Sequence, residues 1–221
     1  MAPEKSVAEQ LLRAIASLFE AGVMQHSGHG NGSVRLGDQR MLLTRSGNLR
    51  HVSEADVSTV DLDGDPNGQG LDPHTAEIVE MHAAIYRERD AVGAILHNHA
   101  PHATSFAVAG QPLPCVYEPL LRFGAAVIPV ADWAPRGSPE SVRNIAGAIS
   151  EQPAAPAVLL ANHGLLAFGE SPAQAARVLM LVEEAATVVL RARLMGGERS
   201  LPEEALAWER ERMARFGASP R

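Results

Sequence analysis

Lysine, cysteine and long apolar runs are what this sequence most clearly lacks. Lys5 is the only lysine, and the other 18 of its 19 lysines and arginines are arginines. Imine chemistry requires a desolvated amine in a pocket, whereas Lys5 lies in a segment that we expect to fray. The sequence therefore argues against lysine-imine aldolases and pyridoxal-phosphate enzymes. Any carbonyl chemistry here requires a metal or a hydrogen-bonding site.

Cysteine is nearly absent too, because Cys115 is the only one. A single cysteine excludes an internal disulfide and a cysteine-based zinc site, and it favours a reducing cytoplasm. No apolar run approaches the roughly 20 residues that span a bilayer, and the first residues carry no signal-peptide pattern. The net charge of -7 argues against nucleic acid or an anionic membrane as partner. The partner that we expect is a small-molecule substrate.

What the sequence does contain is the composition of an ordinary globular domain. Its 221 residues, 46% of them hydrophobic and 20% charged, predict a single domain over residues 1–221, with C-terminal helices from about residue 171. A helix capped by Thr75 is expected from the apolar stripe that includes Ile78 and His82, and His82 should be a hydrogen-bonded core histidine. Short apolar or alternating runs predict strands at 33–36, 41–44, 57–62, 125–130, 158–161 and 165–168.

Two histidines at the end of an apolar run are the most informative feature. Residues 94–96 are apolar, and His97 and His99 follow two residues apart. On an extended strand, residues i and i+2 face the same side, so both imidazoles can reach one point. This arrangement suits a divalent metal, which requires at least one further ligand. His163 is a good third ligand because it lies at the turn between two predicted strands.

A site of three histidines leaves one coordination position open for water or substrate, which is the catalytic arrangement. Zinc is the first expectation for one divalent metal per subunit, with Fe, Mn or Co as alternatives. A metalloprotease helix would need His-Glu-x-x-His, which is absent. A 2-His-1-carboxylate iron site would need an acid near the pair, and residues 98–106 contain none.

Two loops of small residues, 27–33 and 45–48, flank a short predicted hairpin. Four arginines lie between residues 29 and 51 against one acid, Asp38, in a chain that is acidic overall. Free backbone N–H groups near arginines can hold an anion such as phosphate or carboxylate. The alternative is a solvated hairpin with ordinary turns.

Glu77 and Glu80 lie near the start of the helix expected after Thr75. The strand that carries His97 follows this helix at once, so the helix N-terminus and the histidine pair can lie close together. Such glutamates are usually solvated helix residues. Their position relative to the histidines makes either one a candidate acid/base.

Five segments together resemble the class II aldolase/adducin family, which includes fuculose-phosphate aldolase and ribulose-phosphate 4-epimerase. They appear in the family's order and span most of residues 26 to 170. The matching segments are 30–35 (GNGSVR), 42–47 (LLTRSG), 81–86 (MHAAIY), 94–99 (AILHNH) and 159–164 (LLANHG).

The resemblance implies a fold, an assembly and a metal site. The fold class would be α/β, a three-layer α/β/α arrangement with a central, mainly antiparallel sheet. The assembly would be a cyclic homotetramer with active sites at subunit interfaces. By match to the family's motifs, His97, His99 and His163 would be the metal ligands.

The resemblance also implies an acid/base. In the family a glutamate after Pro-Ser-Ser has this role, and Glu77 is its best match. Residues 73–77 (PHTAE) replace that motif, and Glu77 lies five residues before His82, where four are expected. Glu80 therefore stays an alternative. Tyr117 is the match to the family's proton-donating tyrosine.

For the substrate, two of the family's phosphate loops survive, which makes Asn31, Gly32, Ser46 and Gly47 the expected substrate-binding residues. Two serines that help hold phosphate in the family are replaced here. A non-phosphorylated or carboxylated substrate is therefore an alternative to a sugar phosphate.

These observations predict a metal-dependent carbon–carbon lyase that performs retro-aldol cleavage of a hydroxy-carbonyl compound through a metal-stabilised enediolate. The same site could instead support a decarboxylase, an epimerase or a dehydratase. A histidine-ligated iron oxygenase is a further alternative. A non-catalytic module like the adducin head is disfavoured, because it would not need three ligand histidines.

Overall fold

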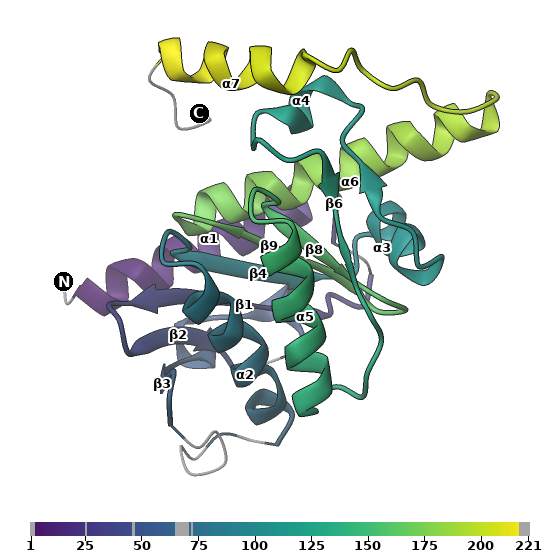
Figure 1. Cartoon of the computed structure of the whole chain (residues 1–221). Coiled ribbons are helices and arrows are strands. Elements are labelled where there is room, and N and C mark those ends of the chain that lie inside the picture. The colour runs from purple at the N-terminus through teal and green to yellow at the C-terminus, as the bar shows by residue number, and fades with distance from the viewer. Residues whose placement is uncertain (1–2, 25, 46, 65–70, 72, 217–221) are drawn as a thin grey trace.

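The structure, a computed structural model, describes residues 3–24, 26–45, 47–64, 71 and 73–216. The helices are α1 (Pro3–Glu20), α2 (Pro73–Glu88), α3 (Pro101–Val108), α4 (Glu118–Leu121), α5 (Pro139–Glu151), α6 (Pro172–Leu194) and α7 (Ala205–Phe216), with short 3-10 turns η1 (Leu49–His51) and η2 (Glu54–Asp56). The strands are β1 (Gly30–Leu36), β2 (Arg40–Thr44), β3 (Val57–Asp61), β4 (Ala94–Asn98), β5 (Leu113–Pro114), β6 (Val127–Ile128), β7 (Val130–Ala131), β8 (Ala157–Leu160) and β9 (Gly164–Gly169). Figure 1 shows their arrangement.

A seven-stranded sheet in the order β3-β2-β1-β4-β9-β8-β7 forms the centre of the protein. Five of its six neighbouring pairs are antiparallel, and β7 and β8 form the parallel pair. β5 and β6 make a separate two-stranded sheet. The central, mainly antiparallel sheet that we expected is therefore confirmed.

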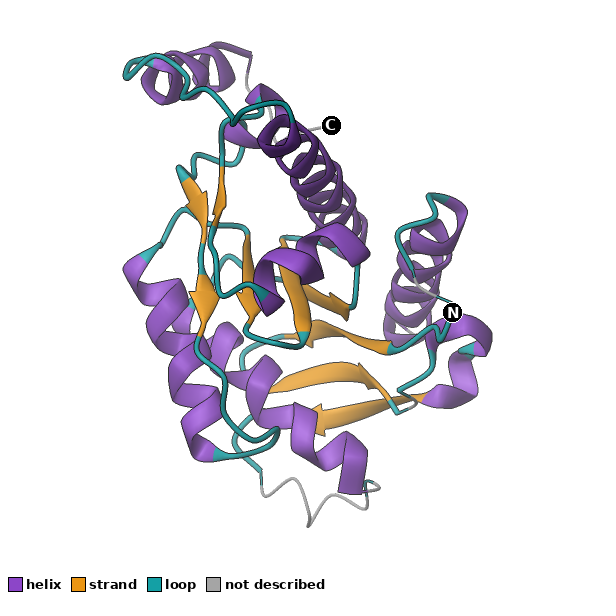
Figure 2. Cartoon of the chain, turned by 90° about the vertical axis from the view of Figure 1, so that its right-hand side faces the viewer, coloured by secondary structure: helices purple, strands orange, loops and turns teal. Residues whose placement is uncertain are grey.

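Helices cover both faces of this sheet, as Figure 2 shows. Successive residues of β4 alternate between two cores: Ala94 and Leu96 pack with residues of α1, α3 and α6. Ile95 packs with residues of α2 and α5. This period-two pattern buries β4 on both sides and confirms the α/β/α layering. His97 continues the alternation of Ile95 and so lies on the α2 side.

Two local expectations are wrong. The strand expected at 125–130 is divided into β6 and β7, because Pro129 between them has no N–H to donate to a strand partner. The helix expected to start after Thr75 begins at Pro73. The Thr75 hydroxyl donates to the Arg45 carbonyl oxygen at 2.7 Å, so it ties the helix to the preceding hairpin.

Two helices, α6 and α7, form the C-terminal part of the described chain. The Ser171 hydroxyl accepts a hydrogen bond from the Gln174 N–H and caps α6. The long helix α6 lies against β4 and β9, and α7 follows beside α4 (Figure 1). None of the described helices is long and apolar enough to cross a membrane.

Candidate metal centre

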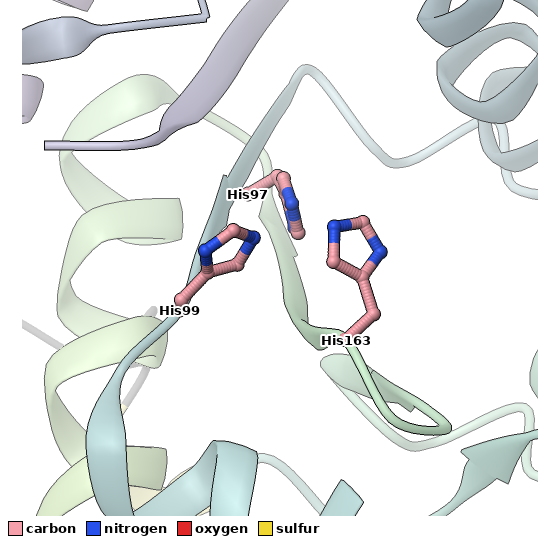
Figure 3. Close-up of side chains that lie close together, drawn as sticks. All are labelled: His97, His99 and His163. Carbon is pink, nitrogen blue, oxygen red and sulfur yellow. The ribbon is translucent and has the colours of Figure 1, made fainter. Parts of the chain in front are cut away.

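Three histidines from two distant segments meet at one end of the central strands. His97 lies near the end of β4, His99 lies just beyond it, and His163 lies in the turn between β8 and β9. One ring nitrogen of each lies within 4.8 Å of the other two. The ring centroids are 4.8, 4.9 and 5.1 Å apart, and Figure 3 shows the rings around a common point. The structure thus brings together the three residues expected as ligands.

The hydrogen bonds of these rings fit a cation site. His97 Nδ1 donates to the Leu165 carbonyl oxygen at 2.9 Å. The lone pair of His97 Nε2 is therefore available to a metal. His99 Nε2 is buried and has no hydrogen-bond partner in the part of the chain that the structure describes. A buried polar atom without a partner is costly and calls for a ligand. The donor set therefore fits one divalent ion with a position left open.

All three imidazoles are held in the neutral form that coordinates metals. Burial lowers the pKa of His163 to about 4, with smaller effects from His99 and from Arg136. Burial is also the main cause that lowers the pKa of His97 well below its ordinary value, and it lowers the pKa of His99. No proton has to be displaced from these rings near neutral pH.

Gly164 permits the close approach of the β8–β9 hairpin to the other two histidines. A Cβ at this position would lie 2.6 Å from the Asn98 carbonyl oxygen and 2.8 Å from His99 Cδ2. The turn also requires Asn162 to adopt a φ of 59°, which asparagine tolerates better than most residues. Asn162 and Gly164 thus explain how the hairpin delivers the His163 ring.

A cavity of about 270 Å³ adjoins the three histidines. Asn31, Gly47, Arg45 and Arg136 contribute to its lining, and none of the described lining residues is acidic. His29 also lines it, with a ring centroid 6.2 Å from that of His99. Two arginines without a neighbouring acid in the wall make this cavity electropositive, which suits an anionic ligand.

A buried chain of hydrogen bonds orients Asn31 in this wall. Ser33 Oγ lies 2.8 Å from the Tyr86 hydroxyl and 2.7 Å from His82 Nδ1. His82 Nε2 lies 2.7 Å from Asn31 Oδ1. Because the amide oxygen can only accept, Nε2 donates to it and Nδ1 accepts from Ser33. Burial lowers the pKa of His82 to about 3, which keeps the neutral ring that this pattern requires.

The expected substrate-binding residues separate into different groups. Asn31 and Gly47 line the cavity. Gly32 does not: its N–H donates to Thr44 Oγ1 at 3.1 Å, and its α-carbon packs toward Leu96 in the core. Ser46 lies outside the described residues.

Helix α2 presents its two candidate acids in different directions. Glu77 lines a second cavity, of about 400 Å³, which shares His163 and Arg136 with the first. Glu80 pairs with Arg87 at 3.0 Å and lines neither cavity. The residue four before His82 is Ile78, and its side chain, not a carboxylate, lines the cavity beside the histidines.

Tyr117 does not meet the histidines of its own chain. Its hydroxyl donates to Glu184 Oε1 on α6 at 2.6 Å, which raises the pKa of the phenol. It lines neither of the two cavities. Any role for Tyr117 at the three histidines would require a second copy of the chain.

Arg136 is the site residue that the sequence interpretation missed. It lies in the turn between β7 and α5, and its Nε donates to Glu77 Oε2 at 3.1 Å. No local pattern marks it, because its partners are far away in the sequence. Arg45, by contrast, was visible in the excess of arginines over acids between residues 29 and 51.

Comparison with known proteins identifies relatives over most of the chain. Residues 9–190 match the family described as the Class II Aldolase and Adducin N-terminal domain. The 5-methylthioribulose-1-phosphate/5-deoxyribulose-1-phosphate aldolase of Rhodospirillum rubrum is 30% identical over 189 residues, which cover 85% of this chain and 82% of the relative.

Solved structures are similar to this fold as well. An L-fuculose 1-phosphate aldolase aligns with a TM-score of 0.81 and 30% identity, over 95% of this chain and 96% of that one. YgbL of Escherichia coli, described as a candidate aldolase/epimerase/decarboxylase, aligns with a TM-score of 0.75 and 26% identity, over 94% and 99% of the two chains. These relatives confirm the expectation of an aldolase-type enzyme. The chain belongs to the class II aldolase and adducin family.

Proposed function

We propose that this protein is a metal-dependent carbon–carbon lyase that cleaves a sugar or sugar-phosphate-like hydroxy-carbonyl compound by retro-aldol chemistry. The convergence of His97, His99 and His163 beside an electropositive cavity carries the proposal. The aldolase relatives, which are named for sugar phosphates, support the reaction class.

The three imidazoles would hold one divalent ion per subunit, zinc in the first place and Fe, Mn or Co otherwise. When bound, the ion supplies Lewis-acid polarisation of the substrate carbonyl, which is worth several kcal/mol of charge stabilisation. The unpartnered His99 Nε2 and the bond from His97 Nδ1 to Leu165 support this assignment.

The cavity wall would bind the anionic end of the substrate. Asn31 uses its Oδ1 to accept from His82, so its Nδ2 is left as a donor toward the cavity. Arg45 and Gly47 lie in the same wall and add a positive charge and exposed backbone. This combination suits phosphate or carboxylate.

Glu77 would be the acid/base. In the proposed cleavage its carboxylate accepts the proton of the substrate's β-hydroxyl. The bond between the α and β carbons then breaks, the β carbon leaves as an aldehyde, and the electron pair stays with the carbonyl fragment. A proton returned to the α carbon completes the reaction. Glu77 is preferred to Glu80 because it shares a cavity with His163, whereas Glu80 pairs with Arg87.

A homotetramer with sites at the subunit interfaces is part of the proposal. Trp133 lines the cavity of Glu77 and is 64% exposed, which is unusual for so large an apolar side chain. Tyr117, remote from its own histidines, would then serve a neighbouring subunit. The cytoplasm remains the expected location, since Cys115 is a buried free thiol.

Decarboxylation is a second candidate for the same site. The similarity to YgbL, described as a candidate aldolase/epimerase/decarboxylase, and the arginine beside the histidines favour it. A decarboxylase would also use polarisation of a carbonyl next to the bond that breaks.

An assay for aldehyde release tests the proposal directly. Zinc-loaded protein is offered L-fuculose 1-phosphate, 5-methylthioribulose 1-phosphate and unphosphorylated L-fuculose, with carbon dioxide release measured in parallel. We expect aldehyde release from at least one ketose, lost in His97→Ala. A carboxylated hydroxy-carbonyl compound is offered as a fourth substrate, and carbon dioxide release from it, without aldehyde, would favour the second candidate. Turnover that survives His97→Ala would contradict both.

A further inference from the structure

We infer that Arg136 is a specificity residue that binds a carboxylate of the substrate beside the three histidines. The inference deepens the proposed function and rests on it. The preferred substrate is then a hydroxy-carbonyl compound that carries a carboxylate close to its reacting carbons. This carboxylate is separate from the anionic group that Asn31 and Arg45 would bind.

The position of Arg136 is the first argument. It borders both cavities and shares each of them with His163, so this residue lies where the two cavities adjoin. A ligand held at the histidines therefore meets Arg136.

The free hydrogen-bonding groups of Arg136 are the second argument. Within the described part of the chain, its one partner is Glu77, which Nε reaches at 3.1 Å. Neither terminal Nη group has a partner among the described residues, and 57% of the side chain is exposed. Such a pair of parallel donors matches the two oxygens of a carboxylate.

The turn that carries Arg136 is well defined, which is the third argument. The Ser138 N–H donates to the Pro135 carbonyl oxygen at 3.0 Å, and Ser138 Oγ caps α5. Gly137 adopts a φ of +75° and packs so closely on Glu77 that a Cβ would lie 2.9 Å from Glu77 Cγ. Arg136 is thus held at the mouth of the site by its backbone and by its bond to Glu77.

Charge balance is the fourth argument. The cavity beside the histidines contains Arg45 and Arg136 and no acid among its described lining residues. Glu77 offsets Arg136 only from the adjoining cavity. A ligand with a single anionic group at Arg45 would leave Arg136 with Glu77 as its one ionic partner, whereas a carboxylate near the reacting carbons would give it a second.

Calorimetric titration of zinc-loaded full-length protein tests the inference. The probes are hydroxypyruvate and dihydroxyacetone, which share a hydroxy-carbonyl unit and differ by a carboxylate in place of a hydroxymethyl group. In Arg136→Gln we expect hydroxypyruvate to bind about tenfold or more weakly, and dihydroxyacetone to change less than about twofold. Arg136→Lys should retain part of the preference. Arg143→Gln, an exposed arginine on α5 that lines neither cavity, is the matched charge control and should change neither probe.

Other results overturn the inference. Hydroxypyruvate binding that is unchanged in Arg136→Gln does so, as does an equal loss for both probes. A loss in Glu77→Gln as large as in Arg136→Gln would mean that the arginine only anchors Glu77. Dihydroxyacetone phosphate is titrated as a third probe, and a loss of binding confined to it would reassign Arg136 to phosphate. The metal content of the same protein reports separately on the proposed function, which fails if the three histidines hold none of zinc, iron, manganese or cobalt, whatever the probes do.

Discussion

Replacing Gly164 with alanine tests whether the close approach of the β8–β9 hairpin sets the geometry of the histidines. The added Cβ would lie 2.6 Å from the Asn98 carbonyl oxygen, 2.8 Å from His99 Cδ2 and 3.2 Å from His97 Cε1. The Asn98 oxygen belongs to the backbone of β4, which pairs with β9. Relief therefore requires the hairpin or the two rings to move.

The expected magnitude follows from these contacts. Overpacking in a close-packed interior costs about 1–3 kcal/mol, and two contacts well below van der Waals distance suggest about 2 kcal/mol of unfolding free energy here. A shift of a few tenths of an ångström at two of the three imidazoles also spoils the ligand geometry. We expect the affinity for zinc to fall about tenfold or more.

Urea unfolding and competition with a chromophoric chelator measure the two effects of Gly164→Ala. Gly147→Ala on α5 is the matched control, because a Cβ there meets nothing within 4 Å. Alanine in a helix interior should stabilise the protein by up to about 1 kcal/mol and leave zinc affinity unchanged. A Gly164→Ala variant within about 0.5 kcal/mol of the parent protein, with unchanged zinc affinity, would refute the reasoning.

Glu77→Gln should lower turnover about 100-fold or more with unchanged metal content, because a general base is lost. Glu80→Gln is the control, and equal turnover in the two variants would exclude Glu77 as the acid/base. In the folded protein the pKa of His82 is about 3, below its ordinary 6.5, so its contribution to stability is complete above pH 6.5 and is lost as the pH falls toward 3. Between pH 7 and pH 5 this histidine lowers the free energy of unfolding by about 2 kcal/mol. Urea unfolding at both pH values should therefore show a fall in that free energy that is about 2 kcal/mol smaller in His82→Gln than in the parent protein. Dialysis against a chelator should abolish cleavage and added zinc should restore it, whereas full activity in the stripped protein would speak against a metal-dependent reaction.

The central strand and its histidines could be predicted because local rules govern them. Alternation along a strand places His97 and His99 toward one point, and the turn at His163 follows from its asparagine and glycine neighbours. Which strands become neighbours in the sheet is a property of the whole fold. The resemblance to a family, and not the spacing of residues in the sequence, predicted the central, mainly antiparallel sheet.

The acid/base could not be resolved from the sequence because the answer depends on helix phase. Successive helical residues are rotated by about 100°, so a shift of one position moves a side chain to a different wall. Ile78 faces the cavity beside the histidines, and Glu77 faces the adjoining one. Only the packed position of α2 reveals this difference.

Arg136 remained hidden for a related reason. It is 59 residues from Glu77 in the sequence, and a lone arginine in a turn has no local signature. The split of the strand at 125–130, by contrast, could have been predicted from Pro129, whose missing N–H disfavours an unbroken strand. The hydrogen bond of Tyr117 to Glu184 also depends on tertiary packing.

Metal analysis of protein purified without added metal tests whether His97, His99 and His163 hold a divalent ion. We expect about one divalent ion per chain in the parent protein and less than about a tenth of that in His99→Ala, because a site of three ligands does not survive the loss of one. Circular dichroism confirms that the variant is folded. A parent protein without bound metal, or a folded His99→Ala variant with the full amount, would contradict the account.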